Sequence, residues 1–201
     1  HPVKGSKDAY FVVEDPHLLE EAAYELKFPV IIKSIYGTHG RGVFIAESKR
    51  SLSPIVEYLI AKEKGPASVQ EYIGEAKGKD LRVFVLGKKI VAAMERVAKS
   101  GEFRSNFHKG GSVGVADLSP EERKMAVRAA QVMGLDISGV DILRTKTGPK
   151  VIEVNSNPGL EGITKASGVD VAGKIVSFME HRVEKYGTKY KRPLSKKGMK
   201  E

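Results

Sequence analysis

Residues 138–157 read SGVDILRTKTGPKVIEVNSN, two runs of mainly apolar, often β-branched residues on either side of Thr147-Gly148-Pro149. Runs of this kind that flank turn-forming residues are typical of β-hairpins. The segment therefore predicts two antiparallel strands, at Ile137–Leu143 and at Lys150–Asn155. These strands carry the polar residues that matter most for function.

Asp141 and Glu153 interrupt the apolar runs of this hairpin. Because strand side chains alternate between two faces, Glu153 and Asn155 point the same way. If the hairpin is centred on Thr147, Asp141 lies directly across from Glu153, with Cβ atoms about 5 Å apart. Two carboxylates this close repel each other unless a cation or a shared proton relieves them. Magnesium fits this ligand set, with nucleotide phosphates as further ligands and Asn155 offering an amide oxygen.

A second interpretation puts the hairpin at the edge of a sheet. Asp141 and Glu153 then face solvent, and each pairs with a basic residue such as Arg144 or Lys150. In the same way, residues 155–159, Asn-Ser-Asn-Pro-Gly, can form a turn and nothing more. The residues alone leave both interpretations open.

A glycine-rich segment, YGTHGRG at 36–42, lies between a predicted strand at Val30–Lys33 and another at Val43–Ala46. Glycines let backbone N–H groups approach phosphates closely, and Lys33 adds a positive charge. The segment matches neither the Walker pattern nor the dinucleotide fingerprint, and it joins two strands instead of opening a helix. A flexible hairpin tip explains it equally well.

The other elements follow from hydrophobic periodicity and capping residues. In chain order they are a strand at 10–13, a helix with Asp15 as N-cap, a helix opened by Ser53-Pro54, strands at 68–72, 81–86 and 90–97, a polar loop at 98–114, a helix capped by Ser119 and Glu122, and a helix at 169–186. This pattern predicts an α+β protein in two small subdomains, with helices on one side of each antiparallel sheet. Their junction is a natural nucleotide cleft.

Composition narrows the chemistry. The chain has 201 residues, of which 41% are hydrophobic, and no cysteine. A substantial core is therefore possible, whereas thiolate metal ligands and thiol nucleophiles are excluded. No run reaches the roughly 20 apolar residues of a membrane span, and the first residues show no secretory pattern. We expect a cytoplasmic protein without a membrane partner, and carboxylate, amide or imidazole ligands for any metal.

The formal net charge is +9, of which residues 188–201 supply +5. A short Lys-rich end of this kind is typical of a solvated, disordered tail. Anionic partners such as ATP or an acidic acceptor peptide suit the remaining balance. A nucleic-acid-binding protein is a less favoured alternative. It predicts salt-dependent binding that is lost when 188–201 are removed, and the sequence shows no basic face interleaved with aromatic residues.

Five ordered segments resemble the ATP-grasp ligases, and within them the RimK-type α-L-glutamate ligases. The segments are PVIIKSIYGTHGRGV at 29–43, VQEYIGEAKGKDLRVFVLG at 69–87, GEFRSNFHKGG at 101–111, GVDILR at 139–144 and VIEVNSNPGLEGITKASGVDVAG at 151–173. Together the resemblance extends over nearly the whole chain to about Lys185. Five segments in family order are far more specific than any one of them alone.

The resemblance implies an ATP-grasp domain at 1–187, with two α+β subdomains, about 25–75 and 76–187, whose antiparallel sheets clasp the nucleotide. It implies that loop 36–42 closes over the phosphates and that a set of residues contacts ATP and metal. These are Lys33 at the phosphates, Glu71 and Tyr72 at the adenine, Asp80 at the ribose, Arg104, Ser105 and Asn106 near the phosphates and the reacting carboxylate, and Asp141, Glu153 and Asn155 as ligands of two Mg²⁺ or Mn²⁺ ions.

The implied activity is ATP-dependent carboxylate-amine ligation, in which L-glutamate is added to a protein or cofactor carboxylate through an acyl phosphate. Lys33 and Arg104 would be the catalytic residues, while Arg82 either reaches the phosphates or pairs with a carboxylate. Ligases of this type often form higher oligomers. They usually also have an additional N-terminal domain ahead of the point that corresponds to the start of this sequence, so a nucleotide-binding module without full ligase activity is the alternative.

Overall fold

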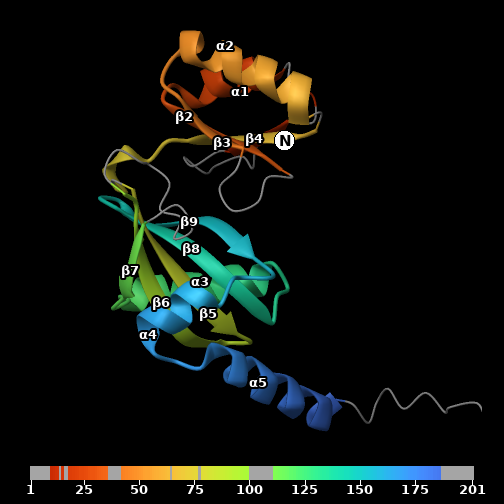
Figure 1. The fold of residues 1–201 in the computed structure, drawn as a ribbon, viewed down its shortest axis with the longest axis vertical. Coiled ribbons are helices and arrows are strands. Elements are labelled where there is room, and N and C mark those ends of the chain that lie inside the picture. The colour runs from red at the N-terminus through yellow and green to blue at the C-terminus, as the bar shows by residue number, and fades with distance from the viewer. Residues whose placement is uncertain are drawn as a thin grey trace, which may run out of the picture. The chain divides into compact units, whose positions relative to one another are not determined.

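The fold is that of a computed structural model of the chain. The structure describes residues 10–13, 15, 18–35, 42–63, 65–76, 78–99 and 111–186. The chain divides into two compact units, the first comprising residues 1–78 and 98–111 and the second residues 79–97 and 112–201. Each unit has its own antiparallel sheet, of four and five strands respectively (Figure 1).

The first unit has strand order β1-β4-β2-β3. Its elements are β1 (Tyr10–Val13), α1 (Leu19–Leu26), β2 (Val30–Ser34), β3 (Val43–Ala46), α2 (Lys49–Tyr58), the π-helical turn η2 (Leu59–Glu63), β4 (Ala67–Glu71) and the 3₁₀ turn η3 (Gly74–Ala76). Alternate residues of β2, Val30 and Ile32, are fully buried in one core cluster with residues of both helices. Both helices therefore cover the same face of this sheet, as expected from the sequence.

The starts of both helices differ from the prediction. The N-cap of α1 is Leu18, which makes no side-chain cap bond, so the assignment of Asp15 as N-cap is wrong. Helix α2 starts at Lys49, because Ser48 and Ser51 form a capping box. In it the Ser51 hydroxyl accepts the Ser48 N–H at 3.0 Å. The predicted start at Ser53-Pro54 is therefore wrong. Pro54 lies inside the helix, where its ring removes one backbone donor, but the capped first turn stabilises the helix before that point.

The second unit has strand order β7-β6-β5-β8-β9. Its elements are β5 (Lys79–Leu86), β6 (Lys89–Val97), β7 (Ser112–Val115), α3 (Pro120–Val132), β8 (Ile137–Thr145), β9 (Gly148–Asn155), α4 (Glu161–Ser167) and α5 (Val171–Tyr186). The sequence did not predict β7 or α4. Strand β7 is only four residues long, and its residue Val115 is 71% exposed, so it shows little of the alternation that marks a half-buried strand.

Helices cover both faces of the second sheet, so the expectation of helices on one side is wrong here. Strand β5 is the reason, because its buried residues alternate between two separate cores. Leu81, Val83 and Val85 pack with residues of α3, among them Ala126 and Ala130. Phe84 and Leu86 pack with Ile163 of α4 and Val171 of α5. The sheet is thus sandwiched between helices, and its two faces have different surroundings.

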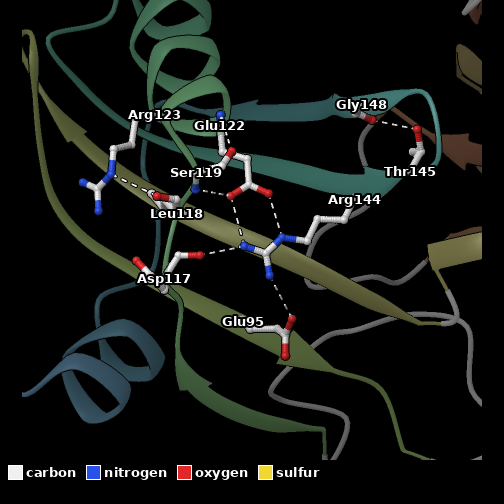
Figure 2. A network of polar contacts seen from close by, with 9 residues as sticks. All are labelled: Glu95, Asp117, Leu118, Ser119, Glu122, Arg123, Arg144, Thr145 and Gly148. Carbon is white, nitrogen blue, oxygen red and sulfur yellow. Dashed lines mark hydrogen bonds and ion pairs between the residues drawn. The ribbon is translucent and has the colours of Figure 1, made fainter.

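The N-terminus of α3 is capped as predicted and is also tied to the sheet (Figure 2). The Glu122 carboxylate accepts the Ser119 N–H at 2.8 Å and the Arg144 Nε–H at 2.7 Å. Arg144, on β8, also donates to the Asp117 carbonyl at 2.7 Å. Although burial opposes it, the hydrogen bond from Arg144 holds the pKa of Glu122 below its ordinary value. One buried carboxylate therefore fixes both the helix start and its docking.

This lowered pKa predicts how stability depends on pH. At pH values between the folded and the unfolded pKa of Glu122, the unfolded chain binds more protons than the folded chain. The contribution of Glu122 to the free energy of unfolding is therefore complete above its unfolded pKa of about 4.3, and it is lost as the pH falls through its folded pKa. Glu122→Gln should cost about 1 kcal/mol at neutral pH and make the acid-side loss of stability shallower. Urea unfolding at a series of pH values measures both. Glu121→Gln, at the exposed neighbouring position, should keep the wild-type slope. Parallel slopes for Glu122→Gln and the wild type would contradict the linkage.

None of the helices in the described part of the chain combines the length and apolar character needed to cross a lipid bilayer.

Candidate functional site

The predicted pairing of the two carboxylates is confirmed, but the hairpin is not centred on Thr147 as assumed, because Thr145 pairs with Gly148, and a β-bulge brings the pairing about. Asp141 of β8 pairs with Glu153 of β9. On the turn side of the bulge Ile142 pairs with Val151, so Ile152 is an extra residue in β9. Without such a bulge, the register set by the turn would place Ile152 opposite Asp141. The local irregularity therefore delivers Glu153 to the position across from Asp141.

The two paired carboxylates have very different surroundings. Glu153 is exposed, whereas Asp141 is only 2% exposed. Arg82 of β5 donates from both Nε and Nη2 to the Asp141 carboxylate, the second bond measuring 2.8 Å. Arg96 of β6 donates to the same carboxylate at 2.7 Å. Arginines from two other strands thus neutralise Asp141, and Arg82 does pair with a carboxylate.

The network continues to Asp80, which lies opposite Arg96 in the sheet. The Arg96 guanidinium reaches Asp80 through two bonds, of 2.6 and 2.7 Å, and Asp80 is only 6% exposed. Asp80, Arg96, Asp141 and Arg82 therefore form one chain of ion pairs across three strands, with formal charges that cancel. The sequence did not identify Arg96, because its role depends on the register that aligns β6 with β5 and β8.

The ion pairs of this network stabilise the charged forms of Asp141 and Arg96. Burial alone would raise the pKa of Asp141, but the positive charges of Arg96 and Arg82 and their hydrogen bonds outweigh it, so this pKa lies below its usual range. Burial would likewise lower the pKa of Arg96, but Asp141 and Asp80 raise it above its ordinary value. Asp141 is therefore an ionised carboxylate at neutral pH.

Asn155 provides the observation that bears most directly on a metal. It lies opposite Gly139, and its buried Nδ2 has no hydrogen-bond partner within the described ranges. A buried unpaired amide is costly, and half a turn of the amide puts Oδ1 in the same place. Three arginine N–H groups use three of the about four lone-pair positions of Asp141. Exposed Glu153, the Asn155 amide and the remaining position on Asp141 fit a hard cation.

The pair Asp141 and Glu153 is not part of a larger cluster of metal-binding side chains in the described part of the chain. Within the described ranges no group of three or more His, Cys, Asp or Glu side chains gathers as a metal site. Magnesium commonly binds one or two carboxylates together with phosphates and water.

Gly139 and Pro158 shape the surroundings of Arg82, and neither was expected from the sequence. A Cβ on Gly139 would lie 2.7 Å from the Pro158 Cβ and 3.0 Å from the Arg82 Cδ. Only glycine allows this approach. Pro158 is buried, so the segment 155–159 contacts the sheet at this residue, while Ser156, Asn157 and Gly159 are exposed. A glycine within an otherwise apolar strand is the signal that could have indicated such a close approach.

The candidate residues of the first unit lie on β2 and β4. Lys33 is half-buried, and strand alternation places it on the face opposite Ile32, which packs against the helices. Glu71 is exposed at the end of β4. Tyr72 follows directly, and its backbone N–H donates to the Pro29 carbonyl at 3.2 Å. The first unit thus holds Lys33 on β2, with Glu71 at the end of the neighbouring strand β4 and Tyr72 directly after it.

Several candidate residues lie outside the described residues, namely Arg104, Ser105, Asn106, most of loop 36–42 and the tail at 188–201. Gly42 is the described member of that loop. It has a positive φ of 69°, and its carbonyl accepts the Ser34 N–H at 2.9 Å. A Cβ on Gly42 would lie 2.9 Å from the Ser34 Cβ, so this end of the loop requires glycine both for its backbone angle and for space.

Solved structures with the same fold define the class of the protein. The chain aligns with the ATP-grasp ligase PsnB, solved with a variant of its minimal precursor, Mg and ADP, at 24% identity and a TM-score of 0.64, covering 90% of this chain and 54% of that one. It also aligns with a RimK domain ATP-grasp protein from Sphaerobacter thermophilus DSM 20745, at 23% identity and a TM-score of 0.64, covering 88% and 61%. The fold is ATP-grasp.

The family is narrower than the fold. The sequence model of the protein family "RimK-like ATP-grasp domain" matches residues 12–179, so the chain belongs to the RimK-like ATP-grasp family. Probable alpha-L-glutamate ligase 1 of Shewanella frigidimarina is 53% identical over 163 residues, which are 81% of this chain and 54% of that protein. The probable alpha-L-glutamate ligase of Aliivibrio salmonicida is 53% identical over 161 residues, 80% and 53%. The chain spans about half the length of these relatives.

Proposed function

We propose that the chain is the ATP-binding and catalytic part of a ligase that joins L-glutamate to a carboxylate of a protein or cofactor. The observation that carries the proposal is 53% identity, over about four fifths of the chain, to proteins named probable alpha-L-glutamate ligases. The exposed Glu153 beside the Asp141–arginine network supports it, because a nucleotide-bound cation needs such oxygens.

The proposed reaction has two steps. In the first, an oxygen of the acceptor carboxylate attacks the γ-phosphorus of ATP, the bond from that phosphorus to the ADP oxygen breaks, and an acyl phosphate and ADP result. In the second, the amine nitrogen of L-glutamate attacks the acyl carbon, the bond to phosphate breaks, and an amide forms as the nitrogen loses a proton. Catalysis consists mainly of positioning and charge stabilisation, so no protein nucleophile is required.

The roles of individual residues are part of the proposal. Lys33 and Arg104 stabilise the charge of the transferring phosphoryl group, with Ser105 and Asn106 beside them, while Glu71 and Tyr72 hold the adenine. Both oxygens of Asp80 already accept hydrogen bonds from Arg96, so a ribose hydroxyl would reach Asp80 only at a lone pair that Arg96 leaves free. Asp80 therefore also acts by fixing Arg96 against Asp141.

Asp141, Glu153 and Asn155 are the proposed ligands of two Mg²⁺ or Mn²⁺ ions. The related fold of PsnB was solved with Mg and ADP, which supports magnesium. When bound, the ion supplies positive charge that offsets the charge of the phosphates. The protein's part is to hold Glu153 opposite Asp141 and to keep Asp141 ionised beside two arginines.

We also propose that the protein acts in the cytoplasm, where ATP is available, and as a homo-oligomer. The proposal of a homo-oligomer follows from the family resemblance.

The turnover experiment measures ADP release from ATP and magnesium with and without L-glutamate, using a peptide that ends in glutamate as acceptor. The proposal predicts ADP release that requires L-glutamate, together with incorporation of labelled glutamate into the peptide. D-Alanine is the matched control, since a D-alanine–D-alanine ligase shares the fold at 20% identity. Nucleotide binding without amino-acid-dependent ADP release would instead favour a nucleotide-binding module, and equal turnover with D-alanine would contradict the glutamate assignment.

A further inference from the structure

A second candidate site lies on the α3 side of the second unit. It is a groove of about 760 Å³ between the β5–β6 turn and one side of α3. We refer to it as the α3 groove. Its lining consists of Lys88, Lys89, Ile90, Arg123, Lys124, Val127, Arg128 and Gln131. Five of these eight residues are cationic and none is acidic.

The positive charges of the α3 groove have little local compensation. Lys88, Lys89, Lys124 and Arg128 are exposed, and none of them makes an ion pair with a carboxylate among the residues that the structure describes. Arg123 donates its Nε–H to the Leu118 carbonyl at 3.2 Å, which orients its guanidinium without neutralising it (Figure 2). Lys124 and Arg128 lie one helical turn apart, where like charges repel. The groove is therefore a concentrated positive surface that attracts anions.

This groove is separate from the Asp141 site. Ile90 and Val127 belong to the core on the α3 face of the sheet, whereas alternation places Arg82 and Asp141 on the other face, together with Phe84. Arg82 lies four residues before the end of β5 at Leu86, roughly 13 Å along the strand at about 3.3 Å per residue, and Lys88 lies in the turn beyond that end. A ligand of the groove is thus not a ligand of the nucleotide site.

The chemistry of the lining favours an acidic peptide over a nucleic acid. Ile90 and Val127 give the groove an aliphatic floor, and Gln131 offers a neutral amide at one end. None of the lining residues is aromatic, so the groove lacks the stacking surfaces on which single-stranded nucleic acids rely. The nine residues of α3 from Arg123 to Gln131 span about 12 Å, which matches about four residues of an extended peptide.

We propose that the α3 groove binds an acidic segment of a protein partner. The segment lies extended along α3, with its carboxylates on the five cationic side chains and its aliphatic groups on Ile90 and Val127. Charge complementarity of this kind sets orientation and speeds encounter. The inference does not depend on ligase activity, and its test contains no nucleotide.

The test uses the full chain and a fluorescein-labelled peptide of about five residues, mostly glutamate with one leucine, measured by fluorescence anisotropy at low salt. The groove variant carries Lys124→Glu and Arg128→Glu. The matched control carries Lys62→Glu and Lys174→Glu, the same change in net charge at exposed positions outside the groove. We expect Kd to rise at least about tenfold in the groove variant and less than about threefold in the control. Circular dichroism verifies that both variants fold.

Three results would overturn the proposal. The wild-type chain fails to bind the peptide, both variants lose affinity equally, or an unlabelled single-stranded oligonucleotide of equal charge displaces the peptide more effectively than unlabelled peptide does. Equal losses would mean that net charge alone attracts the probe. Displacement by the oligonucleotide would assign the groove to nucleic acid instead. Because none of these readouts involves ATP, failure here leaves the proposed ligation reaction untouched.

Discussion

Asp141→Ala is expected to lower the free energy of unfolding of the second unit by roughly 3–5 kcal/mol, because it removes one partner of a buried ion pair. The side chains of Arg82 and Arg96 are only 12% exposed, and both donate hydrogen bonds to Asp141. Without this carboxylate, Arg82 loses the partner of its Nε and Nη2 groups while it stays largely shielded from water. Among the described residues, Arg96 then keeps Asp80 alone as a hydrogen-bond partner.

Urea unfolding measures this loss, and hydrogen exchange at the backbone amides of β8 assigns it to the second unit. Glu153→Ala is the matched control, since it removes a carboxylate directly across the hairpin. Because Glu153 is exposed, its removal should change stability by only about 0.5 kcal/mol or less. Equal losses in the two variants would show that burial of Asp141 among arginines does not determine the cost.

Glu153→Ala should have its large effect on ligand binding instead. For the wild-type chain, magnesium with a non-hydrolysable ATP analogue at about 100 times Kd should add roughly 2.7 kcal/mol of stability. Loss of an oxygen ligand should weaken binding at least about tenfold, which reduces this gain to about 1.4 kcal/mol or less at the same concentration. Thermal unfolding with and without magnesium measures the difference. The physical reason is that Glu153 is the one solvent-accessible carboxylate of the pair.

Glu180→Ala, which removes an exposed carboxylate from α5, is the control and should keep the full gain. An undiminished magnesium-dependent gain in Glu153→Ala would rule Glu153 out as a metal ligand. Absence of any gain in the wild type would mean that this stretch of chain does not hold the nucleotide by itself. The two outcomes are distinguishable because the first retains binding and the second lacks it.

The parts of the fold predicted best are those specified by neighbouring residues. Alternating runs predicted β8 and β9, and the capping box at Ser119 predicted the start of α3. The sequence misplaced α2 because Ser53-Pro54 resembles a helix start as much as the true cap at Ser48 does. It also missed the helices on both faces of the second sheet. A strand buried on both sides loses the simple alternation that shows which face is covered.

Some features of the candidate site were likewise beyond prediction from the sequence. The pairing of Asp141 with Glu153 was predicted by counting residues on either side of the turn. The bulge that produces this pairing is a property of the backbone, and the residue type at position 152 does not indicate it. The burial of Asp141 and its pairing with Arg96 depend on the alignment of β5, β6 and β8. Such alignments join residues far apart in the chain, so periodicity within one segment does not contain them.

The bulge at Ile152 also affects how the sequence of this chain aligns with those of homologues. Because Ile142 pairs with Val151 and Asp141 with Glu153, Ile152 has no partner of its own in the ladder. A homologue one residue shorter at this point would close into a regular hairpin and still present its acid across from the aspartate. A gap at position 152 in an alignment would therefore mark a straighter strand rather than a lost site.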